Sequence, residues 1–263
     1  MLDKSKLSTL VKPDDAESSQ EAKQNISPQE IARFDALAET WWDPNGKYKT
    51  ALLFNQARIS YFIPQICQHF KRDPNDALPL KGLRILDVGS GGGLVCEPLA
   101  KAGATVLGID ASEMSVEVAK RHAVSSQLKI EYRHLLSTDL VKEGQTFDVV
   151  INAEVVEHVP DQQALIAECC ELVVQDGLLV LATLNRTIKS WIIAIVGAEY
   201  VMRYLPVGTH DWRMFVTPQE LNQMADANGL RQVSESGMKY NPFSGVWSLS
   251  QDTSVNYIQC YQK

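Results

Sequence analysis

The feature that most constrains this fold is a short apolar run that leads directly into a cluster of glycines. Residues 84–88 read Arg-Ile-Leu-Asp-Val, and residues 89–93 read Gly-Ser-Gly-Gly-Gly before a helical pattern begins. A buried strand, a tight glycine turn and a helix start bring backbone close to a nucleotide-like ligand. The next predicted strand ends at Asp110, about 20 residues further on, where a carboxylate can bind both hydroxyls of a ribose. The chain is therefore predicted to bind a nucleoside-containing ligand.

The same loop indicates which ligand this is. Leu94 stands where a dinucleotide-binding loop would have its third glycine. Asp87 places a carboxylate beside the turn, where it would repel a pyrophosphate but attract a sulfonium and an ammonium group. We therefore predict an S-adenosylmethionine site that contains Asp87, Gly89, Gly91 and Asp110. Two alternatives stay open: an NAD-dependent dehydrogenase, and a purely structural turn whose two aspartates are solvated strand ends.

Short apolar runs alternate with amphipathic ones over the middle of the chain, which is typical of βαβ units. The predicted strands are 84–88, 105–109, 129–133, 147–152 and 178–183, and the predicted helices lie near 94–102, 112–125 and 161–174. The pattern predicts an α/β fold with a doubly wound, Rossmann-like, mainly parallel sheet. Two or three further strands after residue 228 are expected to add an antiparallel edge. At 263 residues, one domain is expected.

Local signals mark the remaining boundaries. Residues 1–25 are polar and charged, so we predict a disordered tail before a methyltransferase domain at 26–263. Capping boxes at Ser27–Glu30 and Thr217–Glu220 predict helix starts. The first of these helices is expected to close at Trp41 and Trp42, the second to run to Asn228, and another helix to cover 51–70.

Composition excludes several classes of function. A net charge of −7 argues against a nucleic-acid partner, since such binding depends on clustered Lys and Arg. The five cysteines show no paired spacing, which predicts reduced thiols in a cytosol. No apolar leader with a cleavage site opens the chain, so export is not expected.

A group of ionisable residues follows the predicted strand 147–152. If this turn is helical, Glu154, Glu157 and His158 share one face and offer two oxygens and a nitrogen to a divalent cation. Such an ion could favour a nucleophilic oxyanion. The spacing alone fits two other interpretations equally well: acidic residues that stabilise a helix N-terminus, and a histidine that acts as a base without a metal.

Beyond these local patterns, the chain after residue 26 resembles the ubiquinone biosynthesis O-methyltransferase family. The shared stretches are Phe34 through Trp41-Trp42-Asp43, Asn55 with Arg58, LDVGSGGG at 86–93, Glu154–Pro160, Thr183–Arg186, Lys189–Trp191, Gly197–Tyr200, Gly208–Asp211, Tyr240–Pro242 and Val255–Tyr257. The glycine loop occurs in many methyltransferases. The tryptophan pair and the Gly197 and Gly208 stretches are far more specific.

The resemblance implies roles for individual residues. Arg58 would bind the methionine carboxylate of the cofactor, Gly89 and Asp110 its backbone-proximal and ribose parts, and Ala153 would line the site through its main chain. Glu154, Glu157 and His158 would bind a magnesium-like ion, Mg²⁺. Leu52-Leu53 and Asn55-Gln56 depart from the family pattern, which places the local pocket chemistry in question, and Ser90 replaces the usual cysteine.

The resemblance further implies O-methylation of a polyprenylated phenol or quinol in ubiquinone synthesis. An ordinary phenol has a pKa of about 10, so the enzyme must favour the oxyanion through the metal or through His158 as base. Other ubiquinone-biosynthesis enzymes are candidate partners. The alternatives are a methyltransferase for a soluble metabolite, a dehydrogenase and a catalytically silent cofactor-binding protein.

An apolar insertion at 185–216 suggests where such a substrate is met. Within its segment 189–205, residues 191–196 are strongly apolar, but only nine residues separate Lys189 from Glu199, well below the roughly 20 needed to cross a bilayer. On a helical projection its charged residues gather on one side, which predicts a helix lying on the membrane surface. The enzyme would then be cytoplasmic and peripherally bound to the inner face of the membrane. A core helix or an active-site lid is the alternative.

Overall fold

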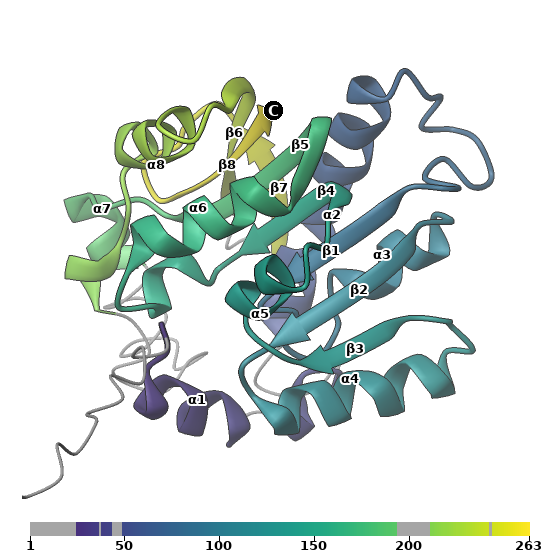
Figure 1. Cartoon of the computed structure of the whole chain (residues 1–263). Coiled ribbons are helices and arrows are strands. Elements are labelled where there is room, and N and C mark those ends of the chain that lie inside the picture. The colour runs from purple at the N-terminus through teal and green to yellow at the C-terminus, as the bar shows by residue number, and fades with distance from the viewer. Residues whose placement is uncertain (1–24, 37, 44–48, 194–210, 242–243) are drawn as a thin grey trace, which may run out of the picture.

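The computed structural model describes residues 25–36, 38–43, 49–193, 211–241 and 244–263. In this part of the chain a single sheet of eight strands runs through the molecule in the order β3-β2-β1-β4-β5-β8-β6-β7 (Figure 1). The predicted α/β fold is therefore confirmed, with helices on both faces of the sheet.

Five parallel strands form the first part of the sheet. They are β1 (Arg84–Val88), β2 (Thr105–Asp110), β3 (Glu131–His134), β4 (Phe147–Ala153) and β5 (Val173–Leu184). All five predicted strands are confirmed, although β5 starts five residues earlier than expected. The order 3-2-1-4-5 places β1 at the centre, and the glycine loop follows it.

The antiparallel edge is also confirmed. It consists of β6 (Arg231–Asn241), β7 (Val246–Ser250) and β8 (Asn256–Gln262). β8 pairs with β5 on one side and with β6 on the other, so the last strand of the chain lies inside the sheet.

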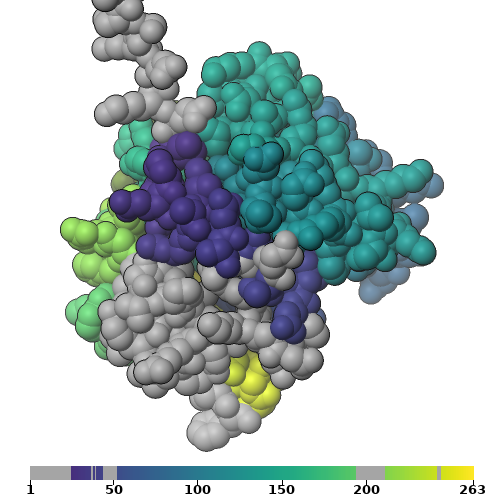
Figure 2. Space-filling view, turned by 90° about the horizontal axis from the view of Figure 1, so that it is seen from below, coloured from purple at the N-terminus to yellow at the C-terminus, as the bar shows by residue number. Residues whose placement is uncertain are grey.

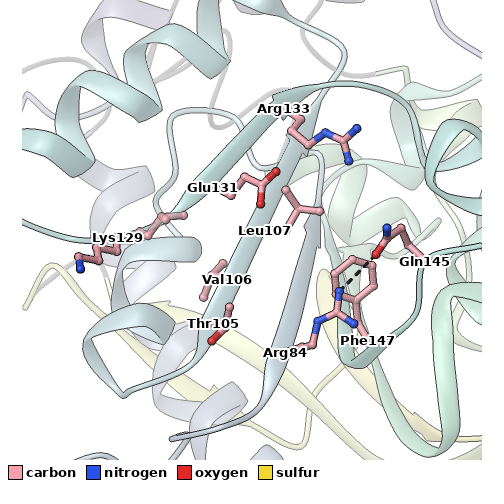
Figure 3. A pocket seen from close by; sticks show the side chains of 10 residues that line it. Arg84, Thr105, Val106, Leu107, Lys129, Glu131, Arg133, Gln145 and Phe147 are labelled. Carbon is pink, nitrogen blue, oxygen red and sulfur yellow. Dashed lines mark hydrogen bonds between the residues drawn. The ribbon is translucent and has the colours of Figure 1, made fainter. Parts of the chain in front are cut away.

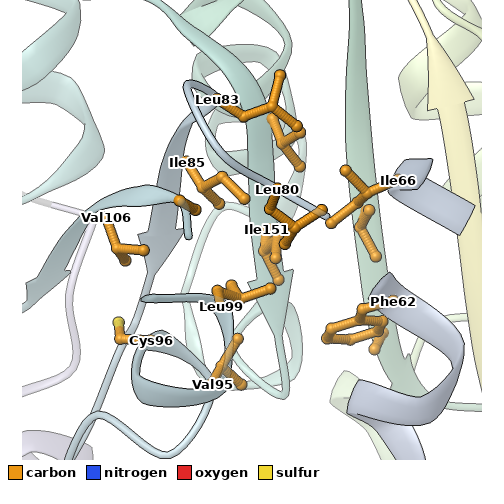
Figure 4. Packing of buried hydrophobic residues seen from close by; sticks show 14 of the residues in the cluster. Phe62, Ile66, Leu80, Leu83, Ile85, Val95, Cys96, Leu99, Val106 and Ile151 are labelled. Atoms are coloured by element: carbon orange, nitrogen blue, oxygen red, sulfur yellow. The ribbon is translucent and has the colours of Figure 1, made fainter. Parts of the chain in front are cut away.

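The two faces of the sheet bury separate clusters. One face packs against α2 (Lys49–His69), α3 (Cys96–Lys101) and α4 (Glu113–Ser125). The other packs against α5 (Ser137–Lys142), α6 (Gln162–Leu172) and α8 (Pro218–Asp226). Figure 4 shows the first cluster, in which Phe62 and Leu99 from the helices lie around Ile85 and Ile151 of the sheet.

Side chains alternate between these two clusters along each strand, as the pleat requires. In β1, Ile85 lies in the first cluster and Leu86 in the second, and in β4 Val149 and Val150 divide in the same way. Because both faces are buried, the strands read as continuous apolar runs, which is why the sequence located them well. All five cysteines are buried and none forms a disulfide.

The N-terminal helix ends earlier than predicted. α1 covers Pro28–Asp35, with the Ser27 side chain accepting a hydrogen bond from the Glu30 amide as the cap. A separate 3₁₀ turn, η1 (Ala38–Thr40), follows, so the expectation that Trp41 and Trp42 close the first helix is wrong. Contacts of the two indole rings with the glycine loop, described below, outweigh the local helical pattern.

Two predicted segments fall largely outside the described residues. Residues 1–24 of the predicted tail do so, while the Asn25 side chain exchanges hydrogen bonds with the backbone of Asp161. Of the predicted docking segment 189–205, only residues 189–193 are described; they begin in α7 (Ile188–Ser190). η4 (Trp212–Met214) then leads into α8, whose predicted capping box is confirmed. No helix among the described residues is long and apolar enough to cross a bilayer.

Candidate active site

The carboxyl ends of β1, β2 and β4 bring the predicted ligand-binding residues to one edge of the sheet. Val88 of β1 pairs with Ile109 of β2 on one side and with Asn152 of β4 on the other. The next residues are therefore the glycine loop, Asp110 and Ala153. In Figure 1 the arrowheads of these strands point toward the side of the molecule where α1 lies. Ligands of open α/β sheets bind at this edge.

The glycine loop turns in a way that a side chain would oppose. Gly89 has φ +77°, and a β-carbon there would lie 2.2 Å from Cγ2 of Val155. The amides of Gly89 and Ser90 both donate to the Ile109 carbonyl, at 2.8 and 2.9 Å. The loop is thus tied to β2, and glycine at its first position is required by space as well as by backbone conformation.

Asp110 is held by the same loop. Its carboxylate accepts hydrogen bonds from the amides of Gly91 and Ser112, each at 2.8 Å. Burial raises its pKa above the ordinary value, and these two hydrogen bonds partly oppose the shift. A carboxylate fixed in this way is oriented before any ligand arrives.

Asp87 is buried rather than solvated, with 2% of its surface exposed. Cys96 donates an S–H hydrogen bond to it at 3.2 Å, which closes the loop between strand and helix. Burial raises the pKa of Asp87 to about 7, against the opposing effects of that hydrogen bond and of Arg58. The alternative of a solvated strand end is therefore wrong for this residue.

Arg58 approaches the site from the buried side of α2. Its Nη2 donates to Asn55 at 3.2 Å, and its Nη1 lies 3.6 Å from a Glu154 oxygen. Burial lowers its pKa, while the carboxylates around it oppose the shift. Among the described residues its Nε and Nη1 have no hydrogen-bond acceptor. A buried guanidinium with unused donors is suited to an anionic ligand such as a carboxylate.

Glu154 and Glu157 do not lie on one helix as the spacing suggested. Glu154 follows β4 with φ +58°, and only Val156–His158 form a 3₁₀ turn, η2. Burial and the nearby charge of Glu157 raise the pKa of Glu154 to about 8. A non-glycine residue in this backbone region is strained, and such strain is common at functional sites.

Glu157 is buried, with 4% of its surface exposed. One of its oxygens accepts from Oγ1 of Thr183 at 2.8 Å, while Oε1 has no hydrogen-bond partner among the described residues. Within the described part of the chain, no group of three His, Cys, Asp or Glu side chains is placed to hold a metal ion. The three-residue metal site expected from the helical spacing is thus not formed there.

His158 turns instead toward the N-terminal helix. Its Nδ1 lies 2.9 Å from a Glu30 oxygen, and its ring meets the edge of Phe34 at 5.3 Å between centroids. Burial would lower the pKa of His158, but the Glu30 hydrogen bond and the nearby acids raise it above its ordinary value. Sequence reasoning read Glu30 only as part of a capping box and missed this contact.

The tryptophan pair covers the glycine loop. Trp42 donates from Nε1 to the Gly92 carbonyl at 2.8 Å and stacks on His122 with 3.6 Å between ring centroids. His122 in turn pairs with the buried Glu97. Trp41 lies against Gly92, where a β-carbon would come within 2.8 Å of the indole. Figure 2 shows the purple N-terminal segment seated against the body of the molecule.

A separate hollow of about 560 Å³ lies at the opposite edge of the sheet, among the starts of the parallel strands (Figure 3). Two of its cations are already engaged: Arg84 bonds to Gln145 and lies over the Phe147 ring, and Arg133 pairs with Glu143. Being at the amino ends of the strands, this hollow is not the candidate active site.

Comparisons with known proteins identify the family of this chain. Residues 86–181 match the family model described as a methyltransferase domain. The chain is 49% identical to the ubiquinone biosynthesis O-methyltransferase of Dinoroseobacter shibae, over 89% of this chain and 95% of that protein. It is 44% identical to the protein of the same name from Bartonella quintana, over 90% and 96%.

Solved structures are similar in fold. Magnesium protoporphyrin IX methyltransferase from Synechocystis with bound SAH aligns with a TM-score of 0.64 and 19% identity, over 89% of this chain and 99% of that one. The plantazolicin methyltransferase BpumL in complex with SAH aligns with a TM-score of 0.60 and 16% identity, over 89% and 96%.

Proposed function

Because this chain belongs to the ubiquinone biosynthesis O-methyltransferase family, we propose that it methylates a phenolic hydroxyl of polyprenylated catechol or hydroquinone intermediates with S-adenosylmethionine. A phenolic oxygen donates an electron pair to the sulfonium methyl carbon as the sulfur–carbon bond breaks. The cofactor becomes a neutral thioether and the phenol loses its proton. The observation that carries the proposal is the set of buried, oriented charges at the carboxyl edge of β1, β2 and β4.

The residues present fit the cofactor. We assign the carboxylate of its methionine part to Arg58, whose buried Nε and Nη1 lack acceptors among the described residues. Asp110 is oriented to bind the ribose, and Asp87 offers negative charge to the ammonium and sulfonium groups. Gly89 and Gly91 allow the loop to approach the ligand closely, and the main chain of Ala153 would line the site from β4.

The acceptor oxygen has to lose its proton near neutral pH. We assign this role to His158 as general base, because its raised pKa and its carboxylate partner suit a proton acceptor. A base in this position contributes about 10²- to 10⁴-fold to the rate. The partly exposed Glu154 and the buried Glu157 would lie beside the acceptor end of the site.

The same two carboxylates fit a magnesium-like ion. Mg²⁺ is commonly held by one or two carboxylates with waters completing its shell, and Glu157 has an oxygen without a hydrogen-bond partner among the described residues. Glu154 and Glu157 would be its ligands. When bound, the ion would supply positive charge that stabilises the phenolate oxygen.

The test is transfer of a labelled methyl group from S-adenosylmethionine to a short-chain demethylubiquinol. We expect turnover that His158→Asn reduces about 100-fold or more, and that chelation reduces and added magnesium restores. Turnover that survives thorough chelation would remove the metal from the proposal. Equal catalytic efficiency on an unprenylated soluble catechol would indicate that the substrate is a soluble metabolite. Binding of NAD in place of S-adenosylmethionine would indicate that the protein is a dehydrogenase.

We further propose that the insertion 185–216 docks the enzyme on the inner face of the membrane, where prenylated intermediates and other enzymes of the pathway would be met. Support comes from its described start, where Trp191, Ile192 and Ile193 are 46%, 50% and 46% exposed. Lys189 bonds to Asp252 and Ser254, which fixes this apolar surface to the loop before β8. Exposed large apolar side chains in a row are typical of an interaction surface.

Flotation with liposomes tests this docking. Trp191→Glu combined with Ile192→Glu should release the protein and lower activity on long-chain more than on short-chain substrates. Met114→Glu with Val124→Glu, two exposed apolar positions on α4, is the matched control and should float like the native chain. Equal flotation of both double variants would contradict the proposed surface.

A further inference from the structure

A closed series of contacts links the glycine loop to the N-terminal segment through two residues that the proposed function does not use, Glu97 and His122. We infer that Glu97 and His122 are positioning residues for cofactor binding, which together hold the indole of Trp42 over the glycine loop. This inference rests on the part of the proposed function that places S-adenosylmethionine at this loop.

The series begins and ends at the glycine loop. Nε1 of Trp42 donates to the Gly92 carbonyl at 2.8 Å. The face of the same indole lies on the ring of His122, with 3.6 Å between centroids and 2° between planes. Nδ1 of His122 lies 2.5 Å from a Glu97 oxygen, and the Glu97 amide donates to the Gly93 carbonyl at 3.1 Å. Because Gly93 is the chain neighbour of Gly92, the four contacts close on themselves.

These contacts join three separate elements. Glu97 lies in the first turn of α3, directly after the loop, and His122 lies in the last turn of α4. Trp42 follows η1, and both α1 and η1 lie against α4 (Figure 1). The N-terminal segment is therefore tied to the loop twice, directly through the Trp42 hydrogen bond and indirectly through α4 and α3.

The imidazole ring of His122 has two constraints on its orientation. The side chain of Glu97 is only 1% exposed, and a buried carboxylate needs hydrogen-bond donors, so it holds the Nδ1 edge of the ring. The face of the ring is then directed at Trp42. An indole N–H lies in the plane of its ring, so a parallel imidazole fixes the direction in which the Trp42 donor points.

The consequence for the cofactor follows from what the loop does. The Gly92 carbonyl accepts from Trp42, and the amide of the preceding Gly91 donates to the carboxylate of Asp110, which is assigned to the ribose. Loss of the imidazole ring should let Trp42 tilt and loosen both contacts. Cofactor binding should then weaken, while the acceptor end of the site, after β4, keeps its residues in place.

His122→Leu tests this by removing both ring contacts at similar bulk. In calorimetry the Kd for S-adenosylmethionine should rise about 3- to 10-fold, as expected for one hydrogen bond and one ring contact. At saturating cofactor, kcat and the KM for a short-chain demethylubiquinol should stay within about twofold of the native values. His69→Leu is the matched control, because the His69 ring also has one hydrogen bond and one aromatic neighbour but bonds to Asp176 near the start of β5. It should bind the cofactor like the native chain.

Two further variants separate positioning from a loss of stability. If His122 acts through Trp42, then His122→Leu should cause no further rise in Kd in a Trp42→Ala chain, since the effects of coupled residues are not additive. Glu97→Gln combined with His122→Leu removes the buried charge that His122→Leu leaves without its partner. The double variant should regain thermal stability but keep the raised Kd.

Three results would overturn the inference: a native Kd in His122→Leu, the same fold-rise in Kd from His122→Leu in the Trp42→Ala chain as in the native one, or a native Kd restored by the added Glu97→Gln. A native chain that does not bind S-adenosylmethionine would instead count against the proposed function. The two failures are therefore distinguishable.

Discussion

Binding of S-adenosylmethionine should weaken as the pH falls below 7, because Asp87 must then lose a proton to accept the cofactor. Asp87 is 2% exposed, and burial raises its pKa to about 7 in the free protein. A sulfonium and an ammonium group nearby favour the ionised carboxylate and would return the pKa toward its ordinary value. Cofactor binding and proton release at Asp87 are therefore linked.

The magnitude follows from this pKa. For one linked proton, the apparent Kd scales as one plus the ratio of proton concentration to the acid constant of the free site. With a pKa of about 7, the apparent Kd should rise about fivefold between pH 7 and pH 6, which corresponds to about 1 kcal/mol. Below pH 6 the slope should approach tenfold per unit.

The stability of the free protein changes in the opposite direction. An acid whose pKa is raised on folding contributes stability that is fully present below its ordinary pKa and is lost as the pH rises through the folded value. For Asp87 the loss extends from about pH 4 to about pH 7, and Glu154, with a pKa of about 8, extends it further. Adding cofactor should therefore stabilise the protein more at pH 7.5 than at pH 6.

Calorimetry in buffers of different ionisation enthalpy measures both quantities, the affinity and the number of protons released. Asp87→Asn should bind more weakly at pH 7 and show a much flatter dependence on pH. Glu154→Gln separates the contribution of the second raised acid. An affinity of the native protein that is equal at pH 7 and pH 6, or an unchanged slope in Asp87→Asn, would refute the reasoning.

Three other substitutions test the geometry of the site. Gly89→Ala should destabilise the protein by about 1–3 kcal/mol, because a β-carbon there would lie 2.2 Å from a valine side chain. Gly144 also has positive φ but has open space around it, so Gly144→Ala should lower the stability measured by thermal denaturation less than Gly89→Ala does. Trp42→Phe keeps a stacked ring but loses the donor to the loop carbonyl, and calorimetry should show cofactor affinity lowered by about 1 kcal/mol. Asp110→Ala should lower that affinity by about 1–3 kcal/mol in a folded protein, and unchanged binding would contradict the ribose assignment.

The sheet could be predicted from the sequence because its strands are buried on both faces. Leu86 and Ile151 lie in such strands, and their apolar neighbours leave little ambiguity. The start of β5 was missed for a local reason. Gln175-Asp176-Gly177 reads as a turn, but the structure carries the strand through it with an irregular register opposite Phe147.

Only those parts of the candidate site that lie at the ends of predicted strands could be predicted from the sequence. Asp87 and Asp110 follow from strand ends in a known topology, so their positions could be derived. Arg58, by contrast, comes from a helix before the sheet, and only the family resemblance pointed to it. The approach of Glu30 to His158 depends on how α1 docks, and no local pattern encodes that. The prediction that Glu154, Glu157 and His158 share one face of a helix was wrong, because the chain leaves β4 with φ +58° at Glu154 and is not helical there.

The distribution of charge indicates which step each group can serve. During methyl transfer the positive charge on sulfur decreases, so a carboxylate close to it, as proposed for Asp87, stabilises the bound cofactor more than the transition state. Such a group favours cofactor capture and weakens retention of the neutral thioether product, but it does not accelerate the chemical step. The acceleration must therefore come from the residues around the acceptor, which need to favour the phenolate form of the attacking oxygen. In the proposed reaction that need is met by His158 as base and by positive charge held at Glu154 and Glu157.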